Sequence, residues 1–125
     1  MLVSGIFFSG PPYKILQAWH ENKFKLVLSQ EIFEEYRRVV EYLSNKYKNI
    51  NVDDVLDIIA VNAEFYHPIE LDKNICDDPD DDKFIACAIS SNTKIIISGD
   101  NHLLKLSGFQ KIDIISPSKF IKKYL

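Results

Sequence analysis

Hydrophobic and polar residues follow two spacings along this chain, and stretches of the two kinds alternate. Spacings of three and four residues are typical of amphipathic helices, and short β-branched runs are typical of buried strands. Spacings of three and four residues predict helices over 12–22, 30–43, from Asn51 or Asp53 to about 63, over 81–91, over 101–106 and from Ser116-Pro117 onward. Short apolar runs predict strands over 25–29, 65–69, 95–98 and 112–116. The alternation indicates an α/β sandwich around a mostly parallel sheet, with Ile95-Ile96-Ile97 buried on both faces.

Composition narrows the class of protein. A length of 125 residues with 46% hydrophobic and 26% charged residues predicts one ordinary globular domain. The net charge of −3 gives no general attraction to nucleic acid. Cys76 and Cys87 do not have the spacing of metal ligands, and few cysteines fit a reducing cytoplasm. We expect neither a signal peptide nor a membrane helix, which needs about 20 apolar residues.

The densest chemical feature is a run of five aspartates within 77–82 that leads directly into an apolar helix. Crowded carboxylates raise one another's pKa unless a cation or a hydrogen-bond donor compensates. The run therefore indicates either a divalent metal site or a well-solvated helix cap. The acids alternate as in a calcium-binding EF-hand loop. However, Lys83 and Ile89 stand where that loop has its glycine and its glutamate, which excludes an EF-hand.

Three acids are expected at one edge of the predicted sheet. Asp100 follows the strand over 95–98, Glu35 lies about one and a half turns into the helix after the first strand, and Asp81 begins another helix. Sites in open α/β sheets form at the carboxyl ends of the strands. If these acids converge, they make an all-oxygen site suited to Mg²⁺ or Mn²⁺. Otherwise Glu35 is a solvated helix acid, Asp81 complements a helix dipole and Asp100 is a turn or cap residue.

Three stretches together resemble the motifs of the PIN domain, and the similarity extends over the whole chain. They are SQEIFEEYRRVV at 29–40, DPDDDKFIACA at 78–88 and IIISGDNHLL at 95–104. The branch with the greatest similarity contains the toxin components of toxin–antitoxin systems (VapC-like), and the run 114–120 also fits it. The resemblance implies one PIN-like domain over 1–125, a three-layer α/β/α sandwich with a mostly parallel central sheet.

The resemblance also implies an activity and a site. Carried over by position, the acidic residues of the family fall on Glu35, Asp81 and Asp100, with Asp78 as an auxiliary metal ligand. A shift of one residue would put Asp82 in the place of Asp81. The implied activity is metal-dependent endoribonuclease cleavage, in which carboxylates hold Mg²⁺ or Mn²⁺. The implied partners are an RNA substrate, a cognate antitoxin protein and a second copy of the chain in a homodimer, all in the cytoplasm.

One departure from the family pattern concerns the start of the chain. PIN domains open with a strand that ends in an Asp-Thr-Asn type motif, whereas Leu2-Val3-Ser4-Gly5 resembles the stretch after that motif. The first strand and its aspartate are thus expected to be missing, through a start site placed too late or a true truncation. Loss of one ligand predicts weak metal binding and low activity. A non-catalytic PIN-fold module that binds an antitoxin or another partner is the alternative function, and a phosphoryl-transfer enzyme is a third.

Overall fold

The structure is a computed structural model that describes residue 5 and residues 10–46 and 51–125. Its helices are α2 (Pro11–His20), α3 (Gln30–Ser44), α4 (Val52–Asn62), α5 (Asp82–Ser90), α6 (Asn101–Leu104) and α7 (Pro117–Tyr124), with 3-10 turns η1 (Pro79–Asp81) and η2 (Phe109–Lys111). Its strands are β1 (Val27–Leu28), β2 (Glu64–Phe65), β3 (Ile95–Ile97) and β4 (Asp113–Ile115). The predicted alternation of helices and strands is confirmed.

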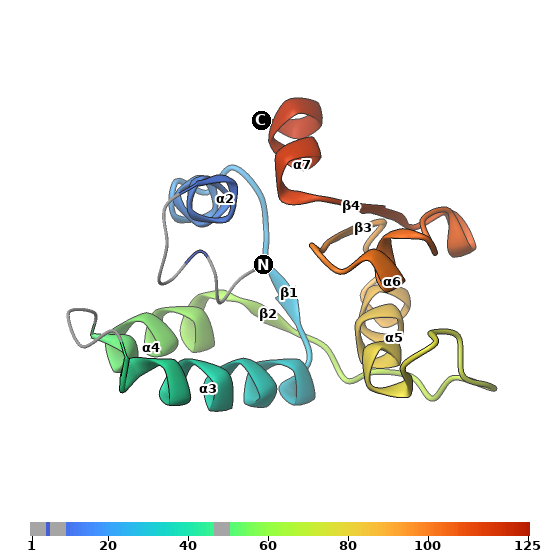
Figure 1. Cartoon of the computed structure of the whole chain (residues 1–125), viewed down its shortest axis with the longest axis horizontal. Helices are drawn as coiled ribbons and strands as arrows, with labels where there is room; N and C mark the ends of the chain where they lie inside the picture. Colours follow the sequence, from blue (N-terminus) through green and yellow to red (C-terminus); the bar gives the residue numbers. More distant parts are fainter. Residues whose placement is uncertain (1–4, 6–9, 47–50) are drawn as a thin grey trace.

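The strands form two parallel pairs. In one pair Val27 of β1 stands opposite Glu64 of β2, and in the other Ile96 of β3 stands opposite Ile114 of β4. Figure 1 shows α2 and α7 on one side of these strands and α3, α4 and α5 on the other. Parallel strands with helices on both sides confirm the predicted α/β class.

Two buried clusters anchor the helices that surround the candidate site. Val40 and Ile32 of α3 pack with Ile59 of α4 in the first cluster. Ile85 of α5 packs with Ile112 beside β4 in the second, and both residues are almost fully buried. Because α3 and α5 are each held by such a cluster, the backbone positions of the side chains that they carry toward the strand ends are well defined.

The second strand is displaced from its predicted range. It was expected over 65–69 but covers Glu64–Phe65, because α4 ends at Asn62 and the Glu64 N–H donates at once to the carbonyl of Leu26. Farther on, the Ile69 N–H donates to the Ser90 hydroxyl, so the chain has left the strand and crosses to α5.

The isoleucines of β3 were expected to be buried on both faces, and this prediction is wrong. All three are half-buried. The physical reason is a cavity of about 220 Å³ that β3 lines together with β1, so that one flank of β3 packs loosely among the described residues.

The prediction about the start of the chain concerns residues 1–9, which apart from Gly5 lie outside the described residues. Over the described part of the chain, no helix combines the length and the apolar character that crossing a membrane requires.

Candidate functional site

Three of the predicted acids line one pocket of about 280 Å³ at the carboxyl end of β3. Glu35 comes from α3, Asp81 from the 3-10 turn before α5, and Asp100 from the loop after β3. The pocket is also lined by apolar and hydroxyl side chains from α3, α5, β3 and α6: Tyr36, Val39, Phe84, Ile96, Ile97, Ser98 and Leu103. The local sequence explains each placement, as the following paragraphs describe.

Ser29 sets the direction in which Glu35 points. Ser29 follows β1 directly, is fully buried, and its hydroxyl accepts a hydrogen bond from the Ile32 N–H at 3.2 Å, which caps α3. The strand and the helix therefore share one junction with no loop between them. Glu35 lies six residues after this cap, on the face of α3 that turns to the strand ends, together with Val39 one turn later. Val39 was expected in the core but is 41% exposed because it borders the pocket.

Asp100 is held by its own loop. Its N–H donates to the Ser98 hydroxyl at 3.0 Å, and its Oδ1 accepts from the His102 N–H at 2.9 Å as the cap of α6. The expected role as a helix cap and the expected place at the strand edge are thus both present. Since the His102 contact uses Oδ1, the Oδ2 oxygen remains for another partner.

Asp81 and Asp82 have different surroundings, although they are adjacent. Asp82 accepts hydrogen bonds from the N–H of Cys76 at 2.7 Å and of Ile75 at 3.2 Å, which tie the preceding loop to the start of α5. Asp81 makes no side-chain capping bond and lies on the pocket lining instead. The geometry therefore favours Asp81 over Asp82 as a site residue.

The electrostatics of the pocket are unfavourable for Asp81. Burial raises the pKa of Asp81 above its ordinary value, and the charges of Asp100 and Asp78 raise it further. Glu35 acts in the same direction, whereas the ammonium group of Lys83 lowers this pKa. Crowding of this kind favours the uptake of a cation, which would offset the repulsion between the carboxylates.

Asp78, predicted as an auxiliary ligand, is exposed and stands apart from the residues that line the pocket. Its Oδ1 accepts a hydrogen bond from the Asp80 N–H at 3.0 Å and caps the 3-10 turn. Its charge still reaches Asp81, as the raised pKa shows. Within residues 10–46 and 51–125, no three His, Cys, Asp or Glu side chains are close enough to ligate a single ion as they stand.

Lys83 is a residue of the site that the sequence reasoning missed. Its Nζ lies 3.1 Å from Glu35 Oε2, and its side chain is only 10% exposed. The available signal was its place two residues after Asp81, directly at the end of the aspartate run. A lysine next to acids is common on solvated surfaces, so this signal is weak without the fold.

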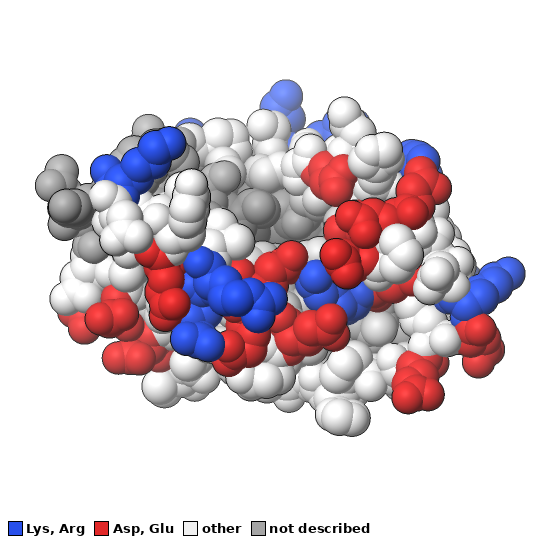
Figure 2. All heavy atoms as spheres, turned by 60° about the horizontal axis from the view of Figure 1, so that its bottom comes forward, with Lys and Arg blue, Asp and Glu red and all other residues white. Residues whose placement is uncertain are grey.

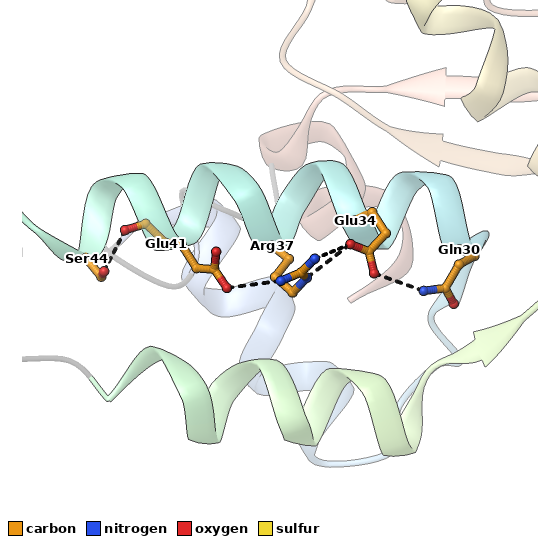
Figure 3. A network of polar contacts seen from close by, with 5 residues as sticks. All are labelled: Gln30, Glu34, Arg37, Glu41 and Ser44. Atoms are coloured by element: carbon orange, nitrogen blue, oxygen red, sulfur yellow. Dashed lines mark hydrogen bonds and ion pairs between the residues drawn. The ribbon is translucent and has the colours of Figure 1, made fainter.

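On the face shown in Figure 2, Lys and Arg lie among Asp and Glu. Figure 3 shows one such network along α3, in which Arg37 contacts both Glu34 and Glu41. Because Arg37 is held by two glutamates, it is not a ready ligand for a phosphate group.

Two comparisons with known proteins give matches to this chain. A family model described as PIN domain matches residues 1–102, a range that contains Glu35, Asp81 and Asp100. The uncharacterized protein MJ1680 of Methanocaldococcus jannaschii is 29% identical to this chain in an alignment of 134 positions, which spans 93% of this chain and 81% of that protein. No solved structure gives a significant match.

Proposed function

Because the chain belongs to the PIN domain family, we propose that it is a metal-dependent endoribonuclease that hydrolyses phosphodiester bonds in RNA. The observation that carries this proposal is the meeting of Glu35, Asp81 and Asp100 on one pocket at the strand ends. They come from three separate segments of the sequence, and their mutual repulsion opposes this arrangement unless a cation balances it.

The chemistry of the donor set fits Mg²⁺ or Mn²⁺. All three side chains offer carboxylate oxygens, which these hard cations prefer. Mg²⁺ usually keeps several waters and binds through one or two carboxylates, so the three acids need not all touch one ion directly. Glu35, Asp81 and Asp100 would hold the ion, and Asp78 would add negative charge nearby. A bound divalent ion supplies Lewis-acid stabilisation of a phosphate oxygen and a more acidic water.

The residues of the chain have distinct roles in this proposal. Asp100 presents Oδ2 from a loop that Ser98 and the His102 N–H hold in place. Asp81 gains from a cation, because burial and the neighbouring carboxylates disfavour its ionised form. The rings of Tyr36 and Phe84, with centroids 6.5 Å apart, form an aromatic wall on one side of the pocket.

Calorimetric titration with Mn²⁺ tests the metal site. Asp81→Asn and Asp100→Asn should each weaken binding at least tenfold. Asp80→Asn is the matched control, because Asp80 belongs to the same acidic run but is exposed and outside the pocket lining. Cleavage of a single-stranded RNA in Mn²⁺ should likewise be reduced in Asp81→Asn and Asp100→Asn and unchanged in Asp80→Asn. Equal binding and cleavage in all variants would refute the site.

We also propose a toxin-type role with an antitoxin protein as the partner and a homodimer as the assembly. The support is the resemblance of the three motifs described above to toxin components. Expression of the chain should arrest bacterial growth, and Asp100→Asn should relieve the arrest. Light scattering should give twice the 14.5 kDa of one chain. A monomeric mass would contradict the homodimer.

A non-catalytic PIN-fold binding module is the second candidate. The observation in its favour is that the described residues hold no three potential ligands within reach of one ion. The Mn²⁺ titration separates the two candidates, because a binding module needs no saturable metal site. Tight binding of a protein partner without metal binding would favour this candidate.

A further inference from the structure

Lys83 differs from the other lysines that form ion pairs among the described residues. Its side chain is 10% exposed, whereas those of Lys23, Lys105 and Lys123 are 53–59% exposed. Exposed pairs contribute little, because water solvates both charges. The contact of Lys83 with Glu35 at 3.1 Å is screened less on the side of the lysine, although the Glu35 side chain is 37% exposed, and breaking this pair leaves the largely buried ammonium group poorly compensated.

Lys83 reaches Glu35 from the first turn of α5 without itself lining the pocket. Its Nζ lies 5.5 Å from the centroid of the Phe84 ring, whose side chain lines the pocket. Its charge also acts on Asp81, two residues earlier in the chain. One ammonium group therefore contacts one of the three carboxylates proposed as ligands and acts through its charge on a second.

We propose that Lys83 is a positioning residue that serves as the internal counter-cation of the carboxylate pocket and competes with the divalent ion for Glu35. In the metal-free protein it partly neutralises the three negative charges, so that the pocket can form. When a divalent ion binds, the ammonium group repels it and must release or share Glu35. This inference rests on the proposed metal site and adds a residue that sets its affinity.

The expected size of the effect follows from the charges. A divalent ion and an ammonium group about 6 Å apart, even with the dielectric constant of bulk water, repel each other enough to weaken binding about tenfold. Lys83→Met removes the charge and keeps the unbranched apolar stem that packs beside Phe84. Lys83→Arg keeps the charge. Lys122→Met is the control, because Lys122 is exposed on α7 and undergoes the same change of charge.

Two measurements test the proposal. In Mn²⁺ titration, Lys83→Met should bind about tenfold more tightly than the wild type, while Lys83→Arg and Lys122→Met stay within twofold. In thermal unfolding without metal, Lys83→Met should have a lower Tm than Lys122→Met, and added Mn²⁺ should restore it. A purely structural lysine would lower the Tm without tightening the metal site.

The outcomes separate the two proposals. If the wild type binds Mn²⁺ and Lys83→Met binds it equally or more weakly, the competition is refuted while the metal site stands. If no variant binds Mn²⁺, the metal site fails, and competition fails with it. The metal-free Tm then decides the counter-cation role: an unchanged Tm in Lys83→Met refutes it, and a loss rescued by Lys83→Arg supports it.

Discussion

Substituting Asp82 and Asp81 one at a time should show that Asp82 stabilises the fold and that Asp81 belongs to the site. The Asp82 carboxylate accepts from Cys76 N–H at 2.7 Å and Ile75 N–H at 3.2 Å, and Cys76 is 6% exposed. A hydrogen bond to a charged group contributes about 1.5–3 kcal/mol, and an orphaned buried donor adds a cost. Since Ile75 and Asp82 are half-exposed, we discount these values and expect Asp82→Ala to lose about 2–3 kcal/mol.

Asp82→Asn keeps one carbonyl acceptor but loses its charge, so we expect a loss of about 1 kcal/mol. Asp81→Asn should leave the stability of the metal-free protein unchanged or raise it, because the ionised Asp81 is unfavourable in the pocket. For a chain of this length, a loss of 2–3 kcal/mol corresponds to a fall in Tm of roughly 8–12 °C.

Urea denaturation followed by fluorescence of Trp19 measures these differences in the metal-free protein. The labelling rate of the Cys76 thiol in a Cys87→Ala background reports whether the loop has opened. We expect faster labelling in Asp82→Ala and no change in Asp81→Asn. An Asp82→Ala variant as stable as the wild type, or a large loss in Asp81→Asn, would refute the division of roles between the two residues.

Two further predictions concern buried groups. Burial raises the pKa of the Cys87 thiol to about 11 from an ordinary 9.0. The stability that this neutral thiol contributes should therefore be complete below pH 9 and be lost as the pH rises from 9 to 11, which denaturation at several pH values measures in comparison with Cys87→Ala. Loss of the Ser29 cap in Ser29→Ala should cost about 1–2 kcal/mol and weaken Mn²⁺ binding, because Glu35 lies on the capped helix. A stable variant with unchanged Mn²⁺ affinity would contradict this link.

Much of the architecture could be predicted from the spacing of apolar residues. The helix over 30–43 and the strand over 95–97 are found almost where the pattern puts them, since each has a strong period and a clear cap or turn. The strand predicted over 65–69 had no such pattern, and its position depends on pairing with β1, which is distant in sequence. Short strands in parallel sheets are specified by tertiary contacts more than by their own residues.

The candidate site shows the same limit. The rule that strand ends meet at one edge brought Glu35, Asp81 and Asp100 together, and the structure places all three on one pocket, while their role as ligands remains a prediction. The sequence could not separate Asp81 from Asp82, because the difference lies in a loop that returns its N–H groups to only one of them. Nor could it show that Lys83 is withdrawn from solvent, since burial depends on the packing of α3 against α5.

The loopless junction at Ser29 has a consequence for how this segment can change in length. Each residue added to an α-helix turns everything after it by about 100°. One insertion between Ser29 and Glu35 would therefore carry the carboxylate away from the pocket, even though every hydrogen bond of the helix could re-form. Substitutions at the exposed Gln30 and Glu31 would keep the direction of Glu35, whereas gains and losses of residues would not. A change in length should be better tolerated at 72–74 before the aspartate run, because these residues are exposed and belong to no helix or strand.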